Sequence, residues 1–166
     1  MTKQNKIDDI FKAQSSNVLN CRNTSYKQRI RKIESVLDWV YKNRESIRHA
    51  LREDLHKPDF ETDITEVWVT LDLGMDVVRN LKKWMRRKKI PSSVSLLLSK
   101  CYLEYYSKGT CLVIAPWNYP FQLCIAPLIY SIAAGNCTVI KPSEMTPSTS
   151  RLVSDMISEL FDSNEV

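Results

Sequence analysis

Three polar side chains stand out in the least polar long segment of the chain, residues 115–144. Asn118 follows one run of apolar residues, and Lys141 and Glu144 follow the next run. A side-chain amide can donate a hydrogen bond to an oxyanion that develops on a carbonyl carbon. A carboxylate can accept hydrogen bonds from a ribose diol, and an ammonium group can donate to ribose hydroxyls or pair with a phosphate. The pattern indicates a nucleotide site beside an oxyanion site.

Each of these residues also has a plainer interpretation. Asn118 could cap the helix that is expected to start near Phe121, because Asn is a good N-cap residue. Lys141 and Glu144 could form an ion pair on the surface of a loop. The spacing alone leaves these alternatives open. The sequence contains neither a G-x-G-x-x-G segment nor a Walker loop, so the usual glycine-rich phosphate cradles are absent from it.

The elements that position these residues begin with a helical first half. A short helix is expected over about residues 7–18. Ser25 followed by Gln28 is typical of a capping box, and it opens one long amphipathic helix that should continue to Pro58. A second long helix should end at Pro91. Apolar residues at three- and four-residue spacing define the two buried stripes: Ile30, Ile33, Leu37, Val40, Ile47 and Leu51 on the first, and Ile64, Val67, Leu71, Met75, Val78, Leu81 and Met85 on the second.

The second half has the pattern of an α/β protein. Residues 100–115 are rich in aromatic and β-branched types and predict a β-hairpin that turns at Ser107–Gly109. An apolar helix at 121–134, a buried strand at 137–141 and an amphipathic helix at 148–161 should follow. Apolar strands that alternate with helices predict a parallel sheet. Two such strands need further neighbours, so we expect an incomplete domain with an exposed apolar edge near Val139 and Ile140.

Composition limits the classes of protein to consider. The chain has 166 residues, enough for one domain with a hydrophobic core, and its three glycines argue against an all-β sandwich. The net charge is +5, with a dense basic cluster at residues 82–89. That cluster could contact phosphates of a nucleic acid or an anionic lipid, but the end of a solvated helix explains it as well.

Cysteine and histidine patterns indicate a reduced protein without a metal site. The five cysteines show no C-x-x-C spacing and fall partly in apolar runs, which favours free core cysteines in a cytoplasmic protein. His49 and His56 lie seven residues apart with no third ligand type nearby, so surface histidines are the simpler interpretation. No secretory signal and no apolar run long enough for a membrane-spanning helix is visible.

Three motifs together resemble the aldehyde dehydrogenase superfamily. They are PWNYPF at residues 116–121, AAGN at 133–136 and KPSE followed by TP at 141–147. The chain is most similar to the branch that oxidises fatty and aromatic aldehydes. The resemblance implies a Rossmann-like sheet that binds NAD or NADP, with long helices at residues 1–99 and the start of the cofactor-binding domain at 100–166. It also implies that residues 101–115 begin at the hairpin through which the family oligomerises.

The resemblance also implies roles for single residues. Asn118 would supply half of an oxyanion hole. Lys141 and Glu144 would bind the ribose of the cofactor's adenosine, and Ser143 would lie near the 2′ position of that ribose. The backbone that would line the cofactor cleft comprises Ala115, Pro116 and Trp117.

Two catalytic segments of that family are missing from this sequence. Neither the G-Q-x-C segment of the nucleophilic cysteine nor the E-L-G-G-K segment of the general base occurs, and the G-S/T-x-x-G turn is also absent. We therefore expect the opening part of such an enzyme, inactive alone, whose partners would be further copies of itself or a complementing carboxy-terminal fragment. The alternatives are a non-catalytic binding or oligomerisation module and, less favoured, a nucleic-acid binder.

Overall fold

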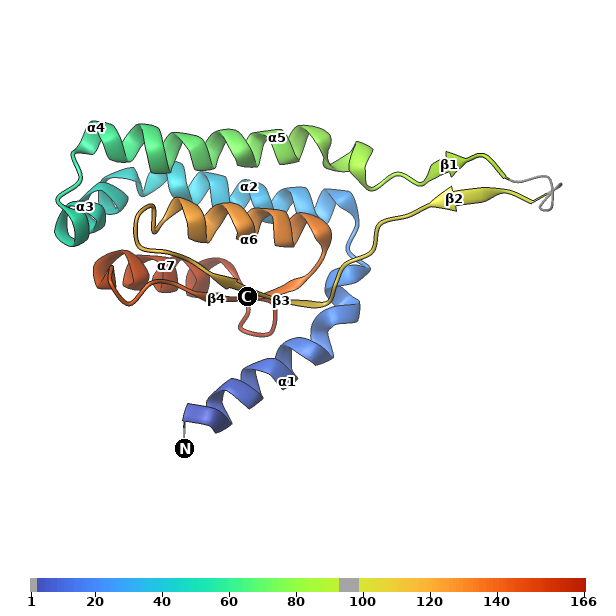
Figure 1. The fold of residues 1–166 in the computed structure, drawn as a ribbon, viewed down its shortest axis with the longest axis horizontal. Helices are drawn as coiled ribbons and strands as arrows, with labels where there is room; N and C mark the ends of the chain where they lie inside the picture. Colours follow the sequence, from blue (N-terminus) through green and yellow to red (C-terminus); the bar gives the residue numbers. More distant parts are fainter. Residues whose placement is uncertain (1–2, 93–98) are drawn as a thin grey trace.

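The structure is a computed structural model that describes residues 3–92 and 99–166. Helices form one thick layer, a small parallel sheet lies beside it, and a two-stranded arm projects from one end (Figure 1). The described elements in chain order are α1 (Lys3–Arg22), α2 (Tyr26–Lys42), α3 (Arg44–Leu55), α4 (Asp59–Thr62), the π-helical turn η1 (Asp63–Trp68), α5 (Val69–Trp84), β1 (Lys88–Ile90), β2 (Cys101–Leu103), β3 (Thr110–Ile114), α6 (Gln122–Ala134), β4 (Cys137–Lys141) and α7 (Pro147–Leu160).

The predicted capping box at the start of α2 is confirmed. The backbone N–H of Gln28 donates to Ser25 Oγ at 3.4 Å, and the backbone N–H of Ser25 donates to Gln28 Oε1 at 2.8 Å. The single long helix expected up to Pro58 is wrong, because the helix ends at Asn43 and α3 starts directly after it. Both the backbone N–H and the side-chain amide of Asn43 donate to the Trp39 carbonyl at 2.9 Å, so this residue closes one helix before the next begins.

The predicted stripe on the second long helix is wrong in part. Ile64, Met75 and Met85 are exposed, whereas Gly74 is buried against Leu37 of α2. A Cβ atom at Gly74 would lie 2.3 Å from Leu37 Cδ2, so the absence of a side chain lets the two helices approach closely. The helix also ends at Trp84 rather than at Pro91. Small and polar residues therefore share the buried face, which comprises Thr62, Glu66, Val67, Thr70, Gly74, Val77 and Leu81.

The hairpin predicted within residues 100–115 is also wrong. β2 pairs antiparallel with β1, which precedes it, and β3 pairs with β4 instead. Residues 107–109 do not turn the chain back, because they are held by other elements. Arg22 Nε donates to the hydroxyl of buried Ser107 at 3.1 Å, and the N–H of Gly109 donates to Asn136 Oδ1 at 3.0 Å. The predicted division between residues 99 and 100 falls between the two strands of the arm and stays a prediction.

The predicted β3–α6–β4 unit is confirmed as a parallel pair joined by a helix. Its register places Thr110 opposite Cys137 and Ile114 opposite Lys141. Gly135 ends α6 with φ 79°, the left-handed conformation that glycine adopts without steric cost. Because β3 and β4 are parallel, the loop that follows each strand starts at the same edge of the sheet.

The two faces of this sheet differ. One face packs on α6, where Thr138 Oγ1 donates to Ser131 Oγ at 2.7 Å, and α2 and α5 cover α6 in turn (Figure 1). Away from α6, the strands contact α1, and Leu112 and Ile114 remain 62% and 66% exposed.

The predicted apolar edge near Val139 and Ile140 is therefore misplaced. Both residues are half-buried, and the most exposed apolar side chains of the sheet lie on β3. The outer edge of β4 is also partly occupied. The N–H of Thr138 donates to the Glu165 carbonyl at 2.8 Å, and its carbonyl accepts a hydrogen bond from Gln14 Nε2 at 2.9 Å.

Candidate functional site

The two polar loops meet at the carboxyl edge of the sheet, as the sequence predicts. The backbone N–H of Ala115, at the start of the first loop, donates to the carbonyl of Lys141, at the start of the second, at 3.0 Å. Ala115 is buried, whereas Pro116 and Trp117 are exposed. Ligands of open α/β sheets bind beyond the carboxyl ends of the strands, which is where these loops lie.

The side chain of Asn118 is free to meet a ligand. It is exposed, and it has no hydrogen-bond partner within residues 3–92 and 99–166. The alternative that Asn118 caps α6 is wrong, because no neighbouring side chain of the turn caps that helix. Its amide can therefore donate to an acceptor that arrives from outside the chain.

The cap of α6 comes from the helical layer. Glu66, on η1, is fully buried, and its Oε2 accepts hydrogen bonds from the N–H groups of Phe121 and Gln122 at 3.0 and 2.9 Å. A carboxylate at this position satisfies two of the free N–H groups of the first turn and complements the helix dipole. Sequence reasoning missed Glu66, although one signal was available: an acidic residue shares a helix face with the apolar Val77 and Leu81.

Lys57 completes this buried group. Its Nζ lies 2.6 Å from Glu66 Oε1 and 4.3 Å from the centre of the Tyr119 ring, and only 6% of its side chain is exposed. The lysine thus contacts the residue next to Asn118 as well as the carboxylate that caps the helix. Glu66 is fully buried and Lys57 almost fully, so each charge depends on the other for its stabilisation.

The second loop is arranged differently. Lys141 Nζ and Glu144 Oε2 form a 2.7 Å ion pair, and both side chains are more than half exposed. The hydrogen bond from Lys141 lowers the pKa of the Glu144 carboxyl below its usual value. Ser143 is buried in the turn, where its hydroxyl accepts from the N–H of Met145 at 3.2 Å. The surface pair that the sequence left open is therefore present.

The helix after this loop also has a carboxylate cap from the helical layer. The two oxygens of Asp54 accept hydrogen bonds from the N–H groups of Ser148 and Thr149 at 3.0 and 2.7 Å. The first turns of α6 and α7 are thus both occupied by side chains of this protein. Neither helix end is open to a phosphate group, in contrast with dinucleotide folds in which a helix N-terminus holds the pyrophosphate.

Two buried cysteines of the sheet unit, Cys124 at the start of α6 and Cys137 at the amino end of β4, lack the character of a nucleophile. Burial raises the pKa of the Cys124 thiol to about 12. Burial, followed by a hydrogen bond to the sulfur of Cys21, raises the pKa of Cys137 to about 12 as well. A thiolate is the reactive form, so these two side chains are inert at neutral pH.

Residues 3–92 and 99–166 hold no group of three or more His, Cys, Asp or Glu side chains that could bind a metal ion. Across the same ranges, every helix is too short or too polar to cross a membrane.

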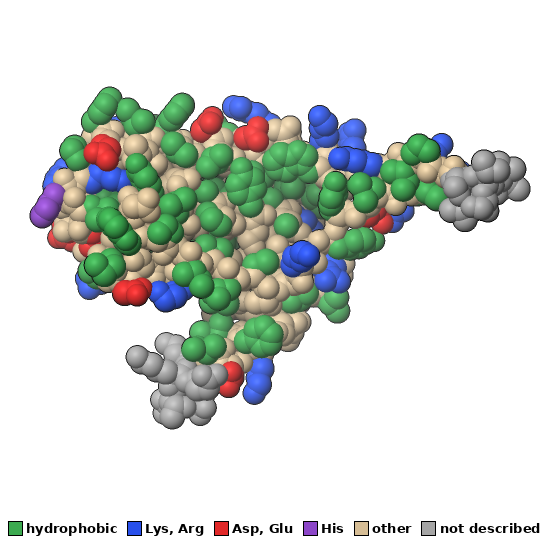
Figure 2. Space-filling model, in the orientation of Figure 1, with side chains coloured by type: hydrophobic (Ala, Val, Ile, Leu, Met, Phe, Trp, Pro, Cys, Tyr) green, Lys and Arg blue, Asp and Glu red, His purple; other side chains and the backbone are tan. Residues whose placement is uncertain are grey.

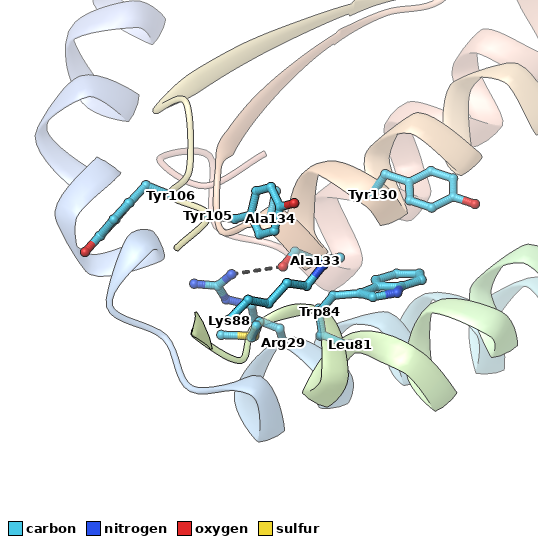
Figure 3. Close-up of a pocket in the computed structure, with 10 residues that line it drawn as sticks. Arg29, Leu81, Trp84, Lys88, Tyr105, Tyr106, Tyr130, Ala133 and Ala134 are labelled. Carbon is cyan, nitrogen blue, oxygen red and sulfur yellow. Dashed lines mark hydrogen bonds between the residues drawn. The ribbon is translucent and has the colours of Figure 1, made fainter. Parts of the chain in front are cut away.

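A hollow of about 370 Å³ lies at the other end of α6 (Figure 3). Arg29 closes this end by donating from Nη1 to the Ala133 carbonyl at 2.9 Å, and Trp84 and Tyr130 point along its walls. α6 has 13 residues, so the hollow lies about 20 Å from the turn that carries Asn118. It is therefore separate from the edge of the sheet where the two loops meet.

The basic cluster at residues 82–89 covers the end of α5 and the base of the arm, where blue side chains gather (Figure 2). Three side chains of this cluster contact residues elsewhere in the chain. Arg87 forms an ion pair with Glu104, Lys82 lies over the ring of Tyr26, and Lys88 lies over the ring of Tyr105.

The parallel strand–helix–strand unit, with polar loops at its carboxyl edge, places the protein among the open α/β sheets. The sequence model of the Aldehyde dehydrogenase family matches residues 1–163. The chain belongs to this family.

A relative and a solved structure from Staphylococcus aureus illustrate the relationship. The chain is 40% identical over 141 residues to 4,4′-diaponeurosporen-aldehyde dehydrogenase of strain NCTC 8325 / PS 47. This alignment covers 84% of this chain and 30% of that protein. The solved structure of the substrate-bound state of Staphylococcus aureus AldH superimposes on this chain with a TM-score of 0.92 and 34% identity. The superposition covers 96% of this chain and 35% of the AldH chain. The chain thus spans about a third of the length of the relatives it matches.

A more distant structure shares the fold. Succinic semialdehyde dehydrogenase from Streptococcus pyogenes, solved in complex with NADP⁺, is 17% identical with a TM-score of 0.84. The match covers 99% of this chain and 35% of that one.

Proposed function

We propose that this chain is the amino-terminal part of an NAD(P)-dependent aldehyde dehydrogenase that converts aldehydes to carboxylic acids through a cysteine thioester. One observation carries the proposal: Asn118 presents a free amide at the sheet edge, beside the loop that bears Lys141 and Glu144. Membership of the family supports it. An apolar aldehyde is the favoured substrate class, and the name of the relative from Staphylococcus aureus supports that choice.

Asn118 would stabilise charge during the addition step. When a thiolate adds to an aldehyde, the carbonyl oxygen becomes negative, and an amide N–H directed at that oxygen lowers the barrier. An amide is suited to the task because it donates without changing its own charge. The exposed position of Asn118 leaves its N–H groups available for this bond.

Lys141 and Glu144 would hold the adenosine ribose of NAD or NADP. Bound NAD(P) supplies the acceptor for the hydride that leaves the aldehyde carbon. The lowered pKa of Glu144 keeps it ionised at neutral pH, so it can accept hydrogen bonds from a diol. Both side chains are exposed, and the loop that bears them starts beside Ala115, whose N–H donates to the Lys141 carbonyl, which supports a cofactor site at this edge with the backbone of Pro116 and Trp117. Ser143 stays a candidate for the neighbourhood of the 2′ position, although its hydroxyl is bonded within the turn.

The nucleophile and the general base must come from other segments. This sequence has no G-Q-x-C or E-L-G-G-K segment, and the pKa values of Cys124 and Cys137 are far above neutral. We therefore expect the 166-residue chain alone to show no aldehyde oxidation. Measurable NAD(P)-dependent turnover by the pure chain, abolished by Asn118→Ala, would contradict this expectation.

A chimera tests the proposal directly. The matching region of the Staphylococcus aureus diaponeurosporen-aldehyde dehydrogenase is replaced by this chain, and cofactor reduction is followed with apolar aldehydes. We expect an active chimera, with Asn118→Ala lowering kcat roughly 10²- to 10³-fold. Asn80→Ala is the matched control, because that amide bonds only to Asp76 on its own helix. An active chimera that tolerates Asn118→Ala would refute the assignment of Asn118.

An oligomerisation module is the second candidate, and the projecting arm of β1 and β2 favours it (Figure 1). Tyr102 and Leu103 on β2 are exposed. If the chain self-associates without cofactor while the folded chimera stays inactive, this second function replaces the first.

A further inference from the structure

The buried carboxylate of Glu66 accepts hydrogen bonds from three donors that belong to two separate parts of the chain. Two are the N–H groups of Phe121 and Gln122, at 3.0 and 2.9 Å, and the third is Lys57 Nζ at 2.6 Å. None of the carboxylate surface is exposed. A carboxylate suits this site because it accepts hydrogen bonds and donates none.

The turn that carries Asn118 is held on its carboxyl side by this group. Downstream, Phe121 is fixed through its N–H and is itself fully buried. Directly after Asn118, the ring of Tyr119 lies 4.3 Å from Lys57 Nζ, so the lysine links the ring to the carboxylate. Pro120 between them is buried and has a fixed φ. The backbone on the carboxyl side of Asn118 therefore has little freedom.

We propose that Glu66, with Lys57, is a positioning residue for Asn118: it fixes the direction in which the Asn118 amide points. The inference rests on the proposed role of Asn118 in stabilising an oxyanion. Oxyanion stabilisation depends on donors that are already aligned before the reaction. A buried ion pair supplies that alignment through the backbone of residues 119–122, without touching the substrate.

The same molecule provides a matched control. Asp54 caps α7 as Glu66 caps α6, with two backbone N–H groups bound to one carboxylate. Asp54 is not bonded to the turn of Asn118. Asp54→Asn and Glu66→Gln thus make the same chemical change at two helix starts, and only Glu66→Gln should affect Asn118. In Glu66→Gln an amide NH₂ group would face donors, so at least one of the three hydrogen bonds is lost.

The first measurement needs no activity. The side-chain amide of Asn118 is observed by ¹⁵N NMR in the 166-residue chain and assigned by its loss in Asn118→Ala. We expect one sharp pair of signals in the unaltered chain. Glu66→Gln should shift and broaden them, whereas Asp54→Asn should leave them in place. If Glu66→Gln does not fold, Lys57→Met retains the carboxylate cap and removes only the ammonium group between Glu66 and Tyr119.

The second measurement uses the active chimera. Glu66→Gln should lower kcat about tenfold with little change in the KM for aldehyde or cofactor, because alignment matters in the transition state. In a chain that already carries Asn118→Ala, Glu66→Gln should have no further effect on kcat. This dependence distinguishes a positioning role from a loss of stability.

The outcomes separate the two proposals. Unchanged Asn118 signals in both Glu66→Gln and Lys57→Met would overturn the positioning role, whatever the activity. Changed signals together with an Asn118→Ala chimera of full activity would show that Glu66 orients a side chain that catalysis does not use. In that case the assignment of Asn118 fails and the structural link between the residues remains.

Discussion

The loop after β3 and the loop after β4 leave the same edge of the sheet, and each leads into a helix capped by a carboxylate of the helical layer. They differ in how their polar side chains are held. Asn118 has no partner among the described residues, but a buried ion pair fixes its turn. Lys141 and Glu144 bind each other in solvent.

This difference suggests two modes of preparing a site. In the function proposed above, Asn118 meets a transition state, and the buried charges that hold its turn are costly to disturb. Groups that hold a cofactor can exchange one partner for another, since an exposed pair contributes little to stability and separates readily. The exposed pair would give up its mutual bond when a ribose arrives. The following predictions test this contrast, from the largest effect on stability to the smallest.

Removal of the two caps should separate the loops most clearly. Glu66→Ala leaves a buried Lys57 charge and two N–H groups unpaired, so the free energy of unfolding should fall by about 3–5 kcal/mol. Asp54→Ala removes a partly buried cap with no buried cation, and should cost about 1 kcal/mol. Urea unfolding of both variants measures the two losses. Equal losses would remove the contrast between the loops.

The helical turn η1 that carries Glu66 begins at Asp63, which forms ion pairs with α3. Arg44 Nε and Arg48 Nε donate to Asp63 Oδ1 at 2.8 and 2.9 Å, and these bonds hold the pKa of that carboxyl well below its usual value. Asp63→Asn should therefore lower the free energy of unfolding at pH 7 by about 2 kcal/mol.

The pH dependence follows from the sign of this shift. A lowered folded-state pKa contributes stability above the unfolded-state pKa, about 3.9, and the contribution is lost as pH falls below that value. Between about pH 4 and pH 2 the unaltered chain should lose part of this stability, with the rest lost at still lower pH, whereas Asp63→Asn should lose less over the same window. Urea unfolding at several pH values checks this, with Glu34→Gln, at an exposed position of α2, as the control. Parallel curves for Asp63→Asn and the unaltered chain would contradict the prediction.

Ser143→Ala tests the local turn of the second loop. The Ser143 hydroxyl accepts from the N–H of Met145, so its loss should lower the free energy of unfolding by about 1 kcal/mol. Ser35→Ala on the exposed face of α2, whose hydroxyl bonds only to its own helix, is the control. A Ser143→Ala variant as stable as this control would show that the turn holds without the hydroxyl.

The exposed pair should have the smallest effect. Lys141→Met and Glu144→Gln should leave the urea midpoint unchanged at low and high salt, because both side chains are solvated. In the chimera the same variants should raise the KM for the cofactor. A large loss of stability in either variant would place this pair in the same category as Glu66 and Lys57.

Sequence patterns predicted the parts of the molecule that short segments determine. The strand at 110–114, the glycine that ends α6 and the capping box at Ser25 depend on neighbouring residues, and they were found as expected. The start of the loops that bear Asn118 and Lys141 at one edge of the sheet also follows from strand direction alone.

The features that sequence patterns missed depend on distant contacts. β2 pairs with a strand that precedes it, so a turn signal at residues 107–109 pointed to the wrong partner. The stripe on α5 was misplaced because Leu37 packs into the space left by Gly74. The cap of α6 comes from 55 residues away; the place of Glu66 on an apolar helix face signals its burial, but no local pattern identifies the helix that it caps.

The direction of these long-range caps has a consequence for synthesis of the chain. Glu66 and Asp54 both precede the helices they cap, by 55 and 94 residues for the first bond of each. On a ribosome, the helical layer emerges first and can assemble before the sheet exists. Each later helix then meets its acceptor already in place as its first turn leaves the exit tunnel, so the order of translation matches the order in which the contacts can form.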